Sequence, residues 1–174
     1  MPARRIKVLI VVGLIVLASA SGLLAWRYAR SSIKPSPLIA DNDLLNKMRN
    51  SVLPPPHRIL VRIHRWSSDP AGGRFERSFE CTVLHDDNVP VDPKMVSDHL
   101  EKWIAGLVKV SSAADETPGA PDVCRAIRYE GEQTAGEVRY TIKPVPGATL
   151  VVDGKESAGN FLTLELRITE QKKP

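Results

Sequence analysis

The chain has 174 residues, a formal net charge of +4 and a sequence pI of about 9.2. Six basic residues and no acidic residue precede Asp41, whereas 18 basic and 20 acidic residues follow position 34. Most of the chain is therefore slightly acidic, which excludes the positive surface that a nucleic-acid-binding domain needs. We expect no nucleic-acid partner.

Residues 8–26 form an uncharged apolar stretch that indicates a membrane-spanning helix. At about 1.5 Å per residue, its length matches a hydrocarbon layer of about 30 Å. Residues 1–7 are then a cytoplasmic tail, and the rest of the chain lies in the periplasm, anchored to the inner (plasma) membrane by a single pass. Membrane lipid is expected to contact the whole stretch, including Val8, Leu14, Leu17, Leu23 and Trp26.

The same stretch also has features of a cleavable export signal. Basic residues lie within 4–7, and Ala18-Ser19-Ala20 fits the small-residue pattern of a cleavage site. Cleavage after Ala20 would leave a periplasmic or secreted protein. The apolar character resumes over residues 22–26, where a cleaved precursor usually becomes polar, so an uncleaved signal-anchor is favoured.

Residues 27–56 are predicted to be a Pro- and Ser-containing linker with one short amphipathic helix over about 41–52. Leu44, Leu45 and Met48 fall on one side of this helix. Because so short a helix is marginal alone, this side must pack on another surface. The protein's own domain is the favoured surface, and a partner protein or the membrane is the alternative, so these residues are interface candidates.

Residues 57–171 have the pattern of a small extracytoplasmic α+β domain. Asp92 is a suitable N-cap and Pro93 a suitable first residue for an amphipathic helix that runs to about residue 108. A loop is predicted over 111–122. The order β-β-α-β-β-β-β indicates a mainly antiparallel sheet with one helix packed on it, or a small sandwich. Strands are predicted over 58–66, 74–84, 123–130, 137–143, 148–153 and 161–169.

Alternation in the first predicted strand places Ile59, Val61 and Ile63 on the buried face and Trp66 on the other. An exposed tryptophan is a common interface anchor, so Trp66 is an interface candidate. Basic residues on this strand and acidic residues on the next predict ion pairs between the two strands.

Cys81 and Cys124 are the two cysteines of the chain. In an exported domain such a pair usually forms a disulfide, worth about 4 kcal/mol for a loop of this length. The strand alternation, however, turns Cys81 inward and Cys124 outward unless Cys124 precedes its strand. A structural disulfide is the expectation, and two thiols are the alternative.

The segment VPGATLVVDGK, residues 145–155, resembles the core of a PEGA repeat, a short β module of envelope and surface proteins. The Gly-x-Thr-Pro that usually follows is replaced here by SAGNF. A Pro-Gly turn, a strand and an Asp-Gly turn also occur in other β domains, so no family is assigned from this segment.

Residues with catalytic potential are sparse. His85, Asp86 and Asp87 with His99 contain metal-binding groups, but they lack a diagnostic spacing and an ordinary turn explains them. There is no Gly-x-Ser-x-Gly and no Gly-rich loop between a strand and a helix. We expect no catalytic residue, metal or cofactor, and the chain is not predicted to be an enzyme.

Topology and composition together favour a membrane-anchored accessory or scaffold subunit of a bacterial cell-envelope complex, in assembly, secretion or a similar process. Its expected partners are other envelope proteins. The alternative is an exported or anchored module that binds a small ligand or a glycan. An unrecognised periplasmic hydrolase or metal enzyme is less favoured.

Overall fold

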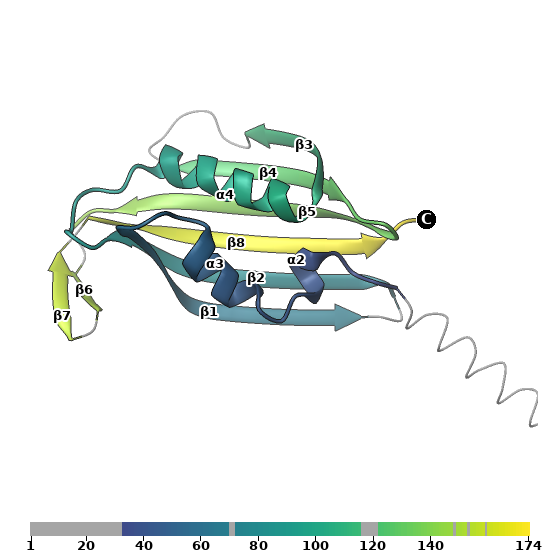
Figure 1. Ribbon diagram of the computed structural model, residues 1–174, viewed down its shortest axis with the longest axis horizontal. Coiled ribbons are helices and arrows are strands. Elements are labelled where there is room, and N and C mark those ends of the chain that lie inside the picture. Colours follow the sequence, from purple (N-terminus) through teal and green to yellow (C-terminus); the bar gives the residue numbers. More distant parts are fainter. Residues whose placement is uncertain (1–32, 70–71, 116–121, 148, 153, 159) are drawn as a thin grey trace, which may run out of the picture.

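The structure is a computed structural model (Figure 1), and the predicted span at residues 8–26 and the alternative cleavage site at Ala20 lie outside its described residues. Within those residues, none of the helices combines the length and the apolar character of a membrane span. The described residues are 33–69, 72–115, 122–147, 149–152, 154–158 and 160–174.

One six-stranded antiparallel sheet forms the centre of the described part, with strand order β1-β2-β8-β5-β4-β3. The β1–β2 hairpin forms one side, the β3–β4–β5 meander forms the other, and β8 returns between them. A separate hairpin, β6–β7, lies at one end of this sheet in Figure 1. The strands are His57–Asp69 (β1), Arg74–His85 (β2), Lys109–Asp115 (β3), Val123–Glu130 (β4), Thr134–Val145 (β5), Thr149–Val152 (β6), Lys155–Ala158 (β7) and Phe161–Lys172 (β8).

Three helices lie on one face of the large sheet (Figure 1), which we call the helix face. Helix α3 lies over β1, and α4 lies over β3, β4 and β5. The opposite face, which we call the open face, has no helix over it among the described residues. The helices are Pro37–Ala40 (α2), Leu44–Ser51 (α3) and Pro93–Leu107 (α4). The expected mainly antiparallel sheet is confirmed, whereas the alternative of a small sandwich is not observed.

Helix α4 begins as its sequence predicts. The Asp92 side chain accepts a hydrogen bond from the backbone N–H of Lys94 at 3.0 Å, and Pro93 follows the cap. A hydrogen bond also holds the helix on the sheet, because the hydroxyls of Ser97 on α4 and Tyr140 on β5 are 2.7 Å apart. Burial raises the pKa of Tyr140, so its hydroxyl remains a hydrogen-bond donor. The apolar side of the helix is buried at Val96, Leu100 and Ile104.

The segment predicted as a linker belongs to the domain. Leu38, Leu44 and Met48 are each 0% exposed and pack in the same core as the strands. Of the three surfaces considered for the short helix, its own domain is the one observed. The apolar side of this helix is part of the hydrophobic core, so residues 36–52 fold together with the sheet.

Two strands appear where turns or loops were expected. β3 occupies Lys109–Asp115, where the loop over 111–122 was predicted, and β7 occupies Lys155–Ala158. β3 is an edge strand with a bulge between Val110 and Ser112, so it lacks a continuous apolar alternation. β6, which lies within the strand predicted over 148–153, pairs with β7, and the last strand pairs with β2 and β5.

Candidate functional site

β1 forms one edge of the sheet, and within the described residues no strand pairs with its outer side. Every residue from 62 to 69 is exposed. Such an edge presents unpaired backbone N–H and C=O groups, which can pair with a strand of another chain. Proteins often protect edges of this kind with charge or a bulge, and β1 has both.

The bulge at Arg62 changes which side chains face the helices. Val61 lies opposite Cys81, but Ile63 lies opposite Glu80, so one extra residue is inserted between the two pairs. Because side chains alternate with a period of two, the insertion reverses the faces of everything that follows.

The face prediction for β1 is therefore wrong beyond Val61. Ile63 lies on the open face with 38% of its surface exposed, whereas Trp66 lies opposite Arg77 on the helix face with 58% exposed. Trp66 is nevertheless exposed, as an interface candidate requires. Both faces of the edge strand thus present an exposed apolar side chain.

Arginines give the β1 edge its charge. Arg62 and Arg65 are exposed, and the structure gives neither an ion-pair partner among the described residues. The expected ion pairs between β1 and β2 do not form at these positions, because Glu76 is instead 2.8 Å from Arg167 of β8. The bulge explains the difference at Arg62, since Ile63 takes the place opposite Glu80 that Arg62 would have in a regular strand.

His64 adds little charge to this edge at neutral pH. Its ring stacks on Phe79, with ring centroids 4.7 Å apart and planes 8° from parallel. Burial, followed by the nearby Arg77 guanidinium, lowers the pKa of His64. The imidazole is therefore neutral near pH 7, and the positive charge at the edge comes from the arginines.

Arg77 of β2, which lies opposite Trp66, connects the sheet to the segment that contains α2 and α3. It is 6% exposed, and its Nη1 donates to the backbone oxygen of Asp41 at 2.8 Å. Burial lowers the pKa of Arg77, against the opposing effect of Asp41. The turn between α2 and α3 is thereby fixed close to the edge strand.

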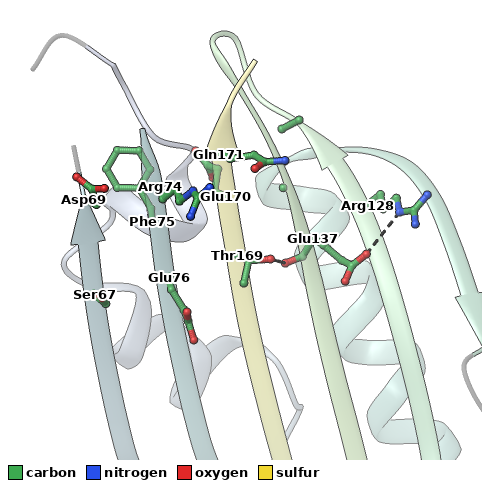
Figure 2. Close-up of a pocket in the computed structure, with 12 residues that line it drawn as sticks. Ser67, Asp69, Arg74, Phe75, Glu76, Arg128, Glu137, Thr169, Glu170 and Gln171 are labelled. Carbon is green, nitrogen blue, oxygen red and sulfur yellow. Dashed lines mark hydrogen bonds and ion pairs between the residues drawn. The ribbon is translucent and has the colours of Figure 1, made fainter. Parts of the chain in front are cut away.

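A shallow groove with a volume of about 710 Å³ lies at one end of the sheet (Figure 2). Glu137 on β5 is 3.4 Å from Nε of Arg128 and 2.9 Å from Nη2 of Arg139. Arg74 on β2 has no ion-pair partner among the described residues. Glu137 is therefore neutralised within the groove, whereas Arg74 lies opposite the Asp69 carboxylate of β1, which also lines the groove.

A buried carboxylate at the same end holds the segment before α2. Glu170 is 3% exposed, accepts the backbone N–H of Ser36 at 2.7 Å and the hydroxyl of Tyr129 at 2.8 Å, and also accepts the Ser36 hydroxyl. Burial and the Glu170 charge raise the pKa of Tyr129, so the phenol remains a donor. Gly136 lies under the Tyr129 ring, where a Cβ would come within 2.4 Å of Cζ. This cluster positions the start of the domain.

The two cysteines are not bonded to each other. Cys81 lies on the helix face and Cys124 on the open face, where its sulfur is 3.4 Å from the Thr141 hydroxyl. Three strand steps separate β2 from β4, or roughly 14 Å, whereas a disulfide needs Cα atoms within about 7 Å. The expected disulfide is therefore wrong for this fold, and the alternation that opposed it is confirmed.

The weak metal hypothesis gains no support from the geometry. The Asp87 backbone N–H donates to Nδ1 of His85 at 3.1 Å, which is a turn contact. No group of three or more His, Cys, Asp or Glu side chains gathers in the part of the chain that the structure describes.

Comparisons with known proteins do not indicate a function for this chain. The chain matches no family model, no curated protein and no solved structure. The sequence predicts Trp66 as an interface candidate, but it predicts neither the bulge nor the exposure of Arg62 and Arg65 without an ion-pair partner among the described residues. The signal was the run of Arg62, His64 and Arg65, which is denser in basic residues than a strand with a simple alternation requires.

Proposed function

We propose that the chain is a membrane-anchored accessory or scaffold subunit of a bacterial cell-envelope complex, and that it acts by binding another protein rather than by catalysis. The apolar stretch at residues 8–26 supports single-pass anchoring in the inner membrane, with the N-terminus in the cytoplasm and the domain in the periplasm.

The observation that carries this proposal is the β1 edge. Thirteen residues of strand leave one backbone side open, and Ile63 and Trp66 add exposed apolar surface on its two faces. Tryptophan is among the residues most often found at the energetic centre of protein interfaces. An edge with these properties is suited to holding a partner chain.

The test is purification of the full chain from its native host in mild detergent, as wild type, Trp66→Ala and Val151→Ala. Val151 is 64% exposed on β6 and serves as the matched control for loss of an exposed apolar side chain. We expect a stoichiometric protein partner with wild type and Val151→Ala, and its loss with Trp66→Ala. A wild-type chain that purifies without a partner contradicts the proposal.

The groove favours a second candidate function, which is binding of a small ligand or a glycan. Its volume suits a small molecule, and Arg74 offers a cation without an ion-pair partner among the described residues. This candidate predicts a monomeric full chain that retains a small molecule in native mass spectrometry and loses it on Arg74→Ala. A protein partner without a small molecule favours the scaffold instead.

A further inference from the structure

We infer that the partner of β1 is an acidic, extended segment of another protein, which adds to the sheet as a strand beside β1. The inference rests on the proposed function and specifies its contact. It follows from the charge of the edge, from the side chains on the two faces of β1 and from the like charges that a second copy of the chain would bring together.

The β1 edge carries unneutralised positive charge. Arg62 and Arg65 are exposed without an ion-pair partner among the described residues, and Arg49 is exposed on α3, the helix that lies over β1. The acidic residue of β1 is Asp69, at its far end, and Glu80 lies one strand further in. A partner strand would therefore meet mainly guanidinium groups, which pair well with carboxylates.

The two faces of β1 define a pattern for the partner. Arg65 lies on the open face, whereas Trp66 lies on the helix face. Side chains of an added strand alternate between the same two faces. The fitting segment therefore carries Asp or Glu on the open face, beside Arg65, and apolar residues on the helix face, beside Trp66.

A second copy of this chain that pairs around the middle of β1 brings like charges together. Twofold antiparallel pairing centred between Ile63 and His64 places Arg62 of each copy opposite Arg65 of the other. Like charges directly opposite each other destabilise a strand pair. In that register, the edge suits a different chain of opposite charge better than a second copy.

The first experiment places a photo-reactive residue at Ser68 of β1 in the full chain, in native membranes. Ala114 of β3, exposed at the opposite edge, is the matched control. We expect a cross-link from Ser68 to a segment of another protein that alternates acidic and apolar residues, and none to that segment from Ala114. A neutral or basic segment, or a second copy of this chain, overturns the inference.

The second experiment changes the charge of the edge. The variant Arg62→Glu, Arg65→Glu is compared with Lys143→Glu, an exposed residue on β5. We expect about a tenfold or greater loss of partner affinity with the edge variant, little change with the control, and a weaker difference at high salt. Partner binding unchanged by the edge variant overturns the inference while the proposed function stands.

A synthetic probe tests the edge without the native partner. An eight-residue peptide that alternates Glu and Val is added to the detergent-solubilised full chain, and amide hydrogen exchange is followed. We expect slower exchange at residues 62–69 with this peptide and no effect from the peptide in which Lys replaces Glu. Equal effects of both peptides contradict the charge argument, and the absence of any partner in native membranes contradicts the proposed function itself.

Discussion

At the residue scale, Gly136 packs against the Tyr129 ring with no room for a side chain. A Cβ at Gly136 would meet Cζ of Tyr129 at 2.4 Å and the backbone oxygen of Thr169 at 2.6 Å. The ring cannot move away easily, because its hydroxyl is held by Glu170. We expect Gly136→Ala to lower the free energy of unfolding by about 1–3 kcal/mol, measured by denaturant titration.

Gly106 on α4 is the matched control, because a Cβ there meets nothing within 4 Å. Gly106→Ala should raise the free energy of unfolding by up to about 1 kcal/mol, since alanine favours the helix. Equal effects of the two substitutions would show that the Tyr129–Glu170 contact is not rigid.

The cysteines give a second prediction at this scale. Burial raises the pKa of Cys81 to about 12, so its thiol stays protonated and shielded at pH 8. We expect Cys124 to react first with a thiol reagent in the folded protein and Cys81 only after unfolding. Protein from the native host should show two thiols when denatured without reductant, and a count of zero contradicts the register that separates the two strands.

At the scale of elements, α2 and α3 stabilise the sheet. Met48 is 0% exposed, whereas Leu45 on the same helix is half-buried. We expect Met48→Ala to cost about 2–5 kcal/mol of unfolding free energy and Leu45→Ala to cost less, as measured by denaturant titration. Similar small losses would mean that α3 is a detachable linker.

The elements also show how far the sequence determines the fold. The β1–β2 hairpin, the β4–β5 pair and α4 follow from alternation, turn residues and the Asp92 cap, because each signal is local. The position of β8 between β2 and β5 is a long-range pairing, which a local pattern does not specify. β3 and β7 lack strong apolar alternation and take strand geometry from a neighbour.

The candidate site was predictable in part, for the same reason. Trp66 could be named because its residue type is informative alone. Its face and the loss of Glu80 as a partner for Arg62 depend on one inserted residue, and the dense run of basic residues there does not specify where a bulge falls.

At the scale of the whole molecule, the proposed function requires both a membrane anchor and an edge strand that binds a partner. The span at residues 8–26 remains a prediction from sequence, and the β1 edge is a feature of the fold. Helices α2, α3 and α4 cover the helix face, so among the described residues the open face and the β1 edge, with its exposed Ile63 and Trp66, remain accessible to another protein.

The most direct test of the central claim is amide hydrogen exchange of the full chain in its native membrane assembly, compared with the same chain after separation from its partner. We expect exchange at residues 62–69 to be slower in the assembly, because an added strand satisfies the open N–H groups of β1. Equal exchange at residues 62–69 in both states, with slowing at another surface, would contradict it.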